Sequence, residues 1–223
     1  GTINTDISKG TDNLLQLSKH KHYNGVAVTT FLGAPKWFQN RYSLMIGQVL
    51  AMLEDDWVIQ IVYDPSQKMA IEGVSYPGIQ RQIRKGRVIL TPLPINMKKI
   101  KKNTLFLTSW FWENIIAEKI LLFGGTSALC ANSKYDISNF TEQFDYIGAP
   151  WGGFKGAGGE GGVTIRHRSA ILAVVKGLEE DLREKGVTLG NAKEDSVLVR
   201  ALLESKQFSS RVATKQVICA IDS

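Results

Sequence analysis

Two apolar, β-rich runs joined by an amphipathic segment constrain the fold of this chain most strongly. The runs span residues 26–32 and 57–63. Between them, apolar residues recur at three- and four-residue intervals from Trp37 to Leu53, which predicts an amphipathic helix. A strand, a helix and a strand at this spacing predict a right-handed βαβ unit in a parallel sheet. Ligands of such sheets bind at the carboxyl ends of the strands.

The rest of the chain continues the alternation of strands and helices. The further strands expected are 87–90, 119–123, 163–166 and 211–220. The further helices expected are 71–84, one capped by Asn103 or Thr104 that ends near residue 117, 169–182, and one that opens with Glu194 and Asp195. The sequence has no internal repeat and no linker that would divide the chain. We therefore predict one α/β domain over residues 21–223, preceded by a lead-in segment, residues 1–20.

Composition narrows the class of protein. Hydrophobic residues make up 43% of the 223 residues and charged residues 22%, which is ordinary for a globular protein. Two cysteines exclude a disulfide framework and a CxxC metal site. No apolar run reaches the ~18 residues of a spanning helix. Membrane attachment would thus need a segment outside this sequence. The location stays open between the cytoplasm and, if an amino-terminal anchor was removed, the Golgi lumen.

The net charge of +6 favours an anionic partner. Much of it is local, because Lys98, Lys99, Lys101 and Lys102 form one run. Such a run is more typical of a solvated face than of a binding site. Nucleic-acid binding is the weakest of the interpretations, since no DNA- or RNA-binding motif accompanies the charge.

Residues 144–168 contain the most unusual stretch. An extended segment ends at Ala149-Pro150-Trp151, seven glycines follow between residues 152 and 162, and a basic cluster closes the stretch at Arg166, His167 and Arg168. Glycines let the backbone approach a ligand closely, so this stretch suits a polar, anionic ligand. A glycine-rich surface loop without a ligand is an equal alternative. The glycines precede a strand and no Gly-Lys-Ser/Thr ends them, so neither a dinucleotide fingerprint nor a Walker loop is present.

Several motifs together resemble a known family. They are LTSWFWE (107–113), EKILLF (118–123), SALC (127–130), FDYIGAPW (144–151), GEGGVTIR (159–166) and Glu194-Asp195. In this order they resemble a GT-A-type glycosyltransferase-like domain family of fungi and other microbes, over roughly residues 24–220. The YIGAPW and GGxxxR elements are the more specific ones. The resemblance implies a GT-A-like, Rossmann-related fold, with a mostly parallel sheet flanked by helices.

The resemblance also implies a metal position, and here the sequence departs from it. GT-A enzymes place an acidic residue after the strand that matches 119–123, where it holds a divalent cation on the donor diphosphate. Thr126 occupies this position, between Gly125 and Ser127. A neutral hydroxyl lacks the anionic oxygen that Mg²⁺ or Mn²⁺ takes from proteins. No cofactor is therefore assigned with certainty: transfer without a metal is one expectation, and a divalent cation, Mn²⁺ or Mg²⁺, stays open as the other.

The remaining site residues follow from the resemblance and from strand ends. Asp195 is expected to be the catalytic base, with Glu194 as the second candidate, although two carboxylates in a first helical turn equally suit the helix dipole. The expected donor-binding residues are Thr29, Thr30, Asp64, Gly125, Thr126, Ser127 and Arg166, where Asp64 also fits an ordinary turn. Backbone N–H groups over 124–127, with Arg166, His167, Arg168 or Lys155, would replace the cation. The expected acceptor-binding residues are Trp151, Glu160, Gly161 and Gly162, and Tyr146 is more typical of core.

The sequence therefore predicts a glycosyltransferase. Its donor would be a nucleotide sugar, and its acceptor a hydroxyl of a glycan, a glycoconjugate or a small molecule. The alternative is a catalytically degenerate protein that binds a nucleotide sugar or a glycan without turnover, which the threonine at position 126 favours.

Overall fold

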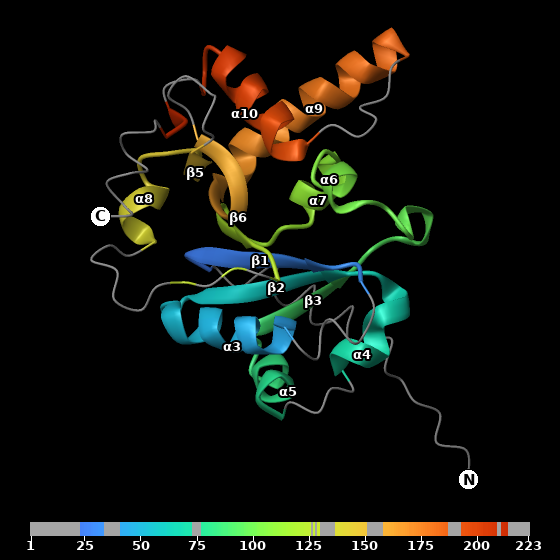
Figure 1. Cartoon of the computed structure of the whole chain (residues 1–223), viewed down its shortest axis with the longest axis vertical. Coiled ribbons are helices and arrows are strands. Elements are labelled where there is room, and N and C mark those ends of the chain that lie inside the picture. Colours follow the sequence, from blue (N-terminus) through green and yellow to red (C-terminus); the bar gives the residue numbers. More distant parts are fainter. Residues whose placement is uncertain are drawn as a thin grey trace.

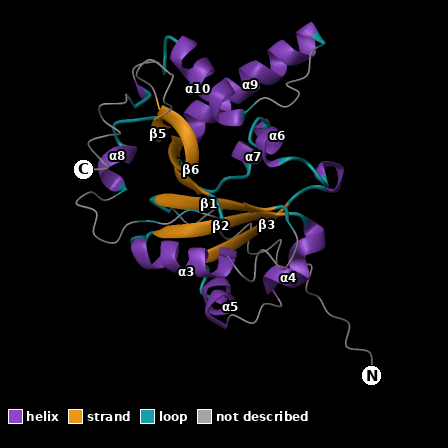
Figure 2. Ribbon diagram, viewed as in Figure 1, coloured by secondary structure: helices purple, strands orange, loops and turns teal. Residues whose placement is uncertain are grey.

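The fold is organised around a mixed six-stranded sheet with the order β3-β2-β1-β4-β6-β5 (Figure 2). The computed structural model describes residues 23–33, 41–72, 77–125, 127, 129, 137–150, 158–186, 193–208 and 211–213. The strands are β1 (Gly25–Phe31), β2 (Trp57–Tyr63), β3 (Val88–Pro92), β4 (Lys119–Phe123), β5 (Tyr146–Pro150) and β6 (Gly158–His167). Strands β3, β2, β1 and β4 pair in parallel, and β6 runs antiparallel to both of its neighbours.

Helices cover both faces of the sheet (Figure 1). One face is covered by α3 (Ser43–Met52), α4 (Lys68–Glu72) and α5 (Pro77–Arg84), and the other by α6 (Lys102–Leu105), α7 (Ser109–Glu113), α9 (Arg168–Lys185) and α10 (Glu194–Glu204). The shorter helices are α8 (Ser138–Thr141) and the 3₁₀ turns η2 (Pro65–Gln67) and η3 (Ile95–Met97). In the described part of the chain, no helix is long and apolar enough to span a bilayer.

Strand β1 shows how the sheet separates two hydrophobic cores. Val26 and Val28 pack into the core beneath α7, α9 and α10, whereas Ala27 and Phe31 pack into the core above α3 and α5. Every residue of β1 and β2 is buried. A parallel strand covered on both faces needs a continuous apolar run, and this pattern made both strands visible in the sequence.

The structure confirms the predicted βαβ unit and corrects several element boundaries. Strands β2 and β4 have the predicted bounds, and α3 begins at Ser43. The single helix expected over 71–84 is two helices, α4 and α5. Strand β6 is longer than expected, because the glycines from Gly158 onward already pair with β5. Of the expected last strand, the described residues form one bridge, between Val212 and Tyr146, and residues 214–220 lie outside the description.

The helix expected from residue 103 to 117 is also two helices, α6 and α7. The chain leaves the helical conformation at Thr108, whose φ of −107° and ψ of 137° are extended. The hydroxyl of Thr108 then accepts a hydrogen bond from the Phe111 N–H and so caps α7. A capping side chain satisfies an N–H that has no partner in the first helical turn. The second helix thus begins at a cap that the hydrophobic periodicity does not reveal.

Candidate active site

The turn after β4 is hydrogen-bonded to Gly162 of β6. The N–H of Gly124 donates to the carbonyl of Gly162 at 2.8 Å, and the Ser127 hydroxyl donates to the same carbonyl at 2.5 Å. The N–H of Ser127 donates to the carbonyl of Gly124 at 3.1 Å. The N–H groups of Gly124 and Ser127 are therefore engaged within the protein, contrary to the expectation that they face a diphosphate.

Close approach explains the glycines at this turn. A Cβ on Gly162 would stand 3.1 Å from the Ser127 hydroxyl, and a Cβ on Gly125 would stand 2.8 Å from Cε2 of the Tyr42 ring. Both distances are shorter than ordinary van der Waals contact. Gly125 and Gly162 thus serve close packing here, whatever else they contact.

Lys102 lies beside this turn, at the beginning of α6. Its Nζ would stand 3.8 Å from a Cβ placed on Gly124, and it lies 5.4 Å from the centre of the Phe106 ring. The sequence favoured a solvated face for the lysine run that includes this residue. A usable signal was its place after β3, since a segment that follows a parallel strand starts at the carboxyl edge of the sheet.

Arg166 is buried and holds Glu194. Its Nη2 donates to Glu194 Oε1 at 2.6 Å, and its Nε donates to the Thr164 hydroxyl at 2.9 Å. The guanidinium is enclosed by aromatic rings of three elements, with distances to the ring centres of 5.0 Å for Tyr146, 5.6 Å for Trp112 and 6.0 Å for Phe106. Burial alone would lower the pKa of Arg166, but the charge of Glu194 raises it. The guanidinium stays charged and fixes the first turn of α10.

Asp195 is the half-buried neighbour of this pair. Its Oδ1 accepts a hydrogen bond from the Ser196 N–H at 2.9 Å. Burial raises the pKa of the Asp195 carboxyl, and the negative charge of Glu194 raises it further. A carboxylate with a raised pKa is better suited to accept a proton than an ordinary aspartate. The two predicted acids therefore differ, because Glu194 is held by Arg166 while Asp195 is desolvated and more accessible.

The predicted donor-binding residues of the first two strands lie at the carboxyl edge, yet they are buried. Thr29 and Thr30 alternate along β1, so their side chains point to opposite faces of the sheet. Asp64 follows β2, and its Oδ1 accepts from the N–H and the hydroxyl of Ser66 at 2.8 and 2.7 Å. The side-chain hydrogen bond from Ser66 lowers the pKa of Asp64. Asp64 thus adopts the turn conformation that the sequence favoured over donor binding.

His167 and Arg168 lie at the amino ends of the parallel strands, opposite to the turn after β4. The register of β4 against β6 places His167 opposite Lys119, at the amino end of β4, and the Arg168 N–H donates to the Glu118 carbonyl. Four residues of β4 separate that end from Phe123, which is about 13 Å. The prediction that these two residues would join the turn after β4 is wrong, because β6 runs opposite to the parallel strands.

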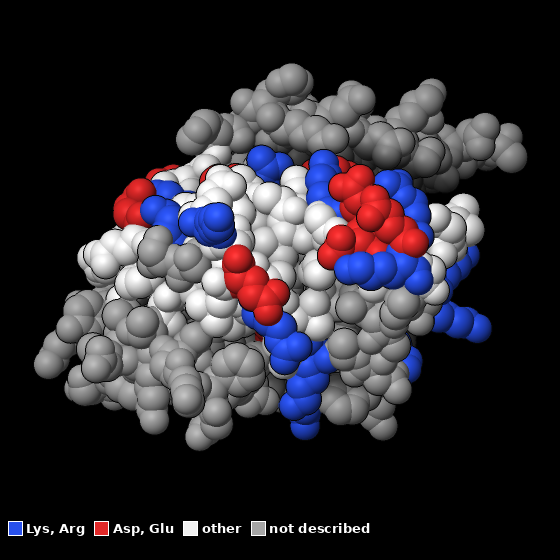
Figure 3. All heavy atoms as spheres, turned by 90° about the horizontal axis from the view of Figure 1, so that it is seen from above, with Lys and Arg blue, Asp and Glu red and all other residues white. Residues whose placement is uncertain are grey.

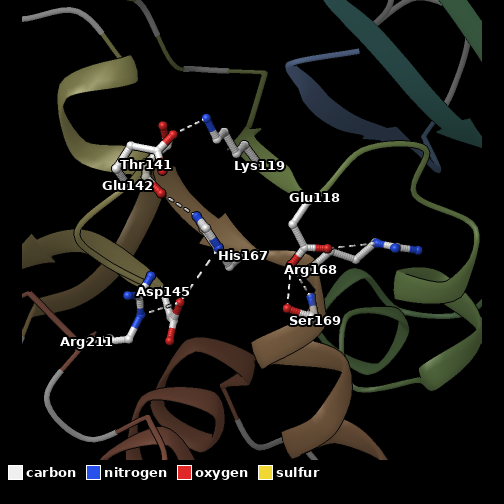
Figure 4. A network of polar contacts seen from close by, with 9 residues as sticks. All are labelled: Glu118, Lys119, Thr141, Glu142, Asp145, His167, Arg168, Ser169 and Arg211. Carbon is white, nitrogen blue, oxygen red and sulfur yellow. Dashed lines mark hydrogen bonds and ion pairs between the residues drawn. The ribbon is translucent and has the colours of Figure 1, made fainter. Parts of the chain in front are cut away.

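A polar network occupies this end of the sheet (Figure 4). The His167 ring donates to the carbonyl of Thr141, and its Nδ1 lies 3.7 Å from Asp145 Oδ1. Asp145 also pairs with Arg211, whose Nε lies 2.9 Å from the same oxygen. The network joins α8, β5, β6 and the segment 211–213. It therefore has a structural role that does not depend on a ligand.

Other predicted site residues are described in part or lie outside the description. Thr126, Trp151 and Lys155 lie outside the described residues. Glu160 and Gly161 belong to β6 by their backbone, and Glu160 pairs with Ala149 of β5. Tyr146 is fully buried, as predicted for a core residue.

The described residues do not assemble a metal site. No group of three or more His, Cys, Asp or Glu side chains with suitable placement occurs among them. Gly124, Gly125 and Ser127 supply no carboxylate at the turn, and of the two acids near it Glu194 is already paired with Arg166. This donor set does not fit a hard divalent cation, which prefers several anionic oxygens.

Residues 91–219, which are more than half of the chain, match the family model described as Protein of unknown function (DUF5672). The chain belongs to this family. No curated protein matches the sequence of this DUF5672 protein.

Among solved structures, glycosyltransferases are similar in fold to the DUF5672 protein at low sequence identity. The apo-form glycosyltransferase GlyE of Streptococcus pneumoniae TIGR4 superposes with a TM-score of 0.50 at 10% identity, over 86% of this chain and 44% of that chain. A second GlyE structure gives 0.49 at 12% identity, over 84% and 45%, and apo mouse xyloside xylosyltransferase 1 gives 0.42 at 12%, over 79% of both chains. The DUF5672 chain thus spans less than half the length of GlyE. The expected single α/β domain, with a central sheet flanked by helices, is confirmed.

Proposed function

We propose that this protein is a glycosyltransferase that moves a sugar from a nucleotide-sugar donor to a hydroxyl of a glycan, a glycoconjugate or a small molecule. The observation that supports it most is the surroundings of Asp195. The fold is similar to that of a glycosyltransferase, and the pKa of the Asp195 carboxyl is raised. The charge of Asp195 also acts on the Lys102 ammonium, which stands at the turn after β4. A proton acceptor and a cation in one place are what glycosyl transfer requires.

In the proposed reaction, Asp195 removes the proton from the acceptor hydroxyl. The freed oxygen bonds to the anomeric carbon of the donor sugar, and the bond between that carbon and the diphosphate oxygen breaks. The electron pair of the broken bond leaves with the nucleoside diphosphate. A carboxylate in this role contributes about 10²- to 10⁴-fold in rate.

Glu194 and Arg166 act as positioning residues in this proposal. The bond from Arg166 Nη2 to Glu194 Oε1 fixes the beginning of α10, and Asp195 is the next residue of that turn. The charge of Glu194 also raises the pKa of Asp195. We therefore assign the proton transfer to Asp195 and not to Glu194.

Replacing Asp195 tests the proposal. Asp195→Asn keeps the size and the polarity of the side chain but cannot accept the proton, so transfer should fall about 10²- to 10⁴-fold. The assay incubates a panel of nucleotide sugars with the protein and measures release of nucleoside diphosphate, with and without Mn²⁺. Asp181→Asn, on the exposed face of α9, is the matched control and should be neutral. Wild-type turnover by Asp195→Asn would refute the assignment.

A binding protein without turnover remains the second candidate, because the turn after β4 has no acidic residue and no metal-ligand group occurs among the described residues. The two candidates differ in one measurement. A nucleotide sugar that stabilises the folded protein, yet is neither hydrolysed nor transferred, indicates the binding protein.

Nucleic-acid binding is less well supported. On the face seen in Figure 3, acidic and basic side chains are intermixed among the residues that the structure describes. Some exposed basic side chains form ion pairs with acidic ones, such as Lys176 with Glu113 and Lys185 with Asp181. A nucleic-acid interface would instead present a continuous basic surface.

A further inference from the structure

The Lys102 ammonium is the feature of the site that the sequence did not assign. It stands where the turn after β4 meets β6, within 3.8 Å of a Cβ position on Gly124 and over the Phe106 ring. Among the described carboxylates, none forms an ion pair with it, although Glu194 and Asp195 both act on its charge. A lysine in such a place retains its capacity to bind an anion.

The Lys102 ammonium lacks a directly paired counter-charge among the described carboxylates. The residue as a whole is exposed, yet its ammonium is desolvated enough to lower its pKa, and the nearby charge of Arg166 lowers it further. Glu194 and Asp195 oppose this effect, and neither forms an ion pair with the ammonium. A phosphate group at the ammonium would supply the missing counter-charge through charge-assisted hydrogen bonds.

Other groups expected to bind a diphosphate are engaged elsewhere. The N–H groups of Gly124 and Ser127 donate within the protein, Arg166 is buried against Glu194, and His167 and Arg168 lie at the opposite edge. Among the described basic residues considered for this role, Lys102 is the one whose charged atom stands at the turn after β4.

We infer that Lys102 binds the diphosphate of the donor and stabilises the negative charge that develops on it when the bond to the sugar breaks. This inference rests on the proposed glycosyltransferase function. The leaving nucleoside diphosphate takes the electron pair of the broken bond, Lys102 donates hydrogen bonds to its oxygens, and the acceptor proton goes to Asp195. Lysine performs here part of the charge neutralisation that a metal ion performs in other transferases.

Binding measurements on Lys102→Met test the inference without knowledge of the acceptor. Calorimetry of the full chain with UDP, GDP, ADP and CDP, with the corresponding nucleosides, and with inorganic pyrophosphate reports the contribution of the diphosphate. Lys102→Met should weaken diphosphate binding about ten- to a hundredfold and leave nucleoside binding unchanged. Lys102→Arg should restore most of it. Lys206→Met removes the same charge beyond the end of α10, which lies about 14 Å along the helix from Asp195, and should have no effect.

The outcomes separate this inference from the proposed function. Equal diphosphate affinity of the wild type and Lys102→Met overturns the role of Lys102 and leaves the transferase proposal standing. Pyrophosphate binding that depends on Lys102, with no preference for any nucleotide, supports the anion site but overturns the nucleotide-sugar donor. A wild-type protein that binds none of these probes overturns both.

Discussion

At the scale of single residues, Asp195 occupies a position that opposes stability. An acidic side chain in the first turn of a helix normally stabilises it through the helix dipole. Here burial, and then the charge of Glu194, raises the pKa of Asp195, so the folded state binds this proton more tightly than the unfolded state does. Above that pKa the ionised carboxylate costs folding free energy, which is typical of residues retained for function.

Removing the charge of Asp195 should also stabilise the folded protein. Asp195→Asn should unfold at a higher urea concentration than the wild type at pH 7. The gain should shrink as the pH falls through the raised pKa and vanish below the unfolded value, where Asp195 is protonated in both states. Urea titrations across this pH range measure the effect. If Asp195 served the helix dipole alone, the substitution would instead destabilise the protein at pH 7.

At the scale of elements, the joint between β6 and α10 depends on one buried ion pair. The Arg166 and Glu194 side chains are 2% and 10% exposed. Because the guanidinium lies among Phe106, Trp112 and Tyr146, the pair also connects the residue after α6, helix α7 and strand β5 to this joint. Burying both charges costs much desolvation free energy. Removing one partner should therefore destabilise the protein strongly, whereas replacing both by apolar side chains should cost little.

Arg166→Met should therefore destabilise the protein by about 3–5 kcal/mol, because it leaves the Glu194 carboxylate buried without its partner. The double variant Arg166→Met/Glu194→Leu should recover most of this loss, since neither charge remains. Chemical denaturation of the wild type, Arg166→Met, Glu194→Leu and the double variant gives the coupling free energy of the pair in a double-mutant cycle. Additive losses in the double variant would contradict the pairing.

The sequence predicts the buried strands of this fold better than its caps and strand directions. Strands β2 and β4 were predicted with their observed bounds because each is an apolar run that ends sharply at turn residues or glycine. The split into α6 and α7 was missed because it depends on the Thr108 cap. The direction of β6 was not predicted, since its glycines carry no hydrophobic alternation. Lys102 was missed because its importance arises from Gly124 and Glu194, which are distant in sequence.

At the scale of the whole molecule, β1 is the strand on which both cores depend. It pairs with β2 on one side and with β4 on the other, and it separates the two hydrophobic clusters. At its first residue, Gly25, the Trp57 ring lies so close that a Cβ would overlap Cζ2, Cε2 and Cη2 of the ring. Trp57 is itself 2% exposed, so it has little room to move.

Gly25→Ala should thus destabilise the fold by about 1–3 kcal/mol through overpacking. A domain of this size would lose roughly 2–4 °C in Tm for each kcal/mol. Gly177→Ala in α9 is the control, because a Cβ there meets nothing within 4 Å and alanine favours a helix by about 0.5–1 kcal/mol. Differential scanning calorimetry under identical conditions should show a lower Tm for Gly25→Ala and a higher Tm for Gly177→Ala than for the wild type. A Gly25→Ala protein as stable as the wild type would contradict the observed packing of Trp57.

The reversed direction of β6 also orders events during synthesis. When residue 123 has left the ribosome, β1, β2, β3 and β4 can already pair, but β5 has to wait for β6, which is its neighbour in the described sheet. Because α10 emerges later still, Glu194 reaches Arg166 only after the sheet is complete. A nascent chain can therefore pair its four parallel strands before α10 and Asp195 emerge, whereas the core that α9 and α10 cover is completed only with those helices.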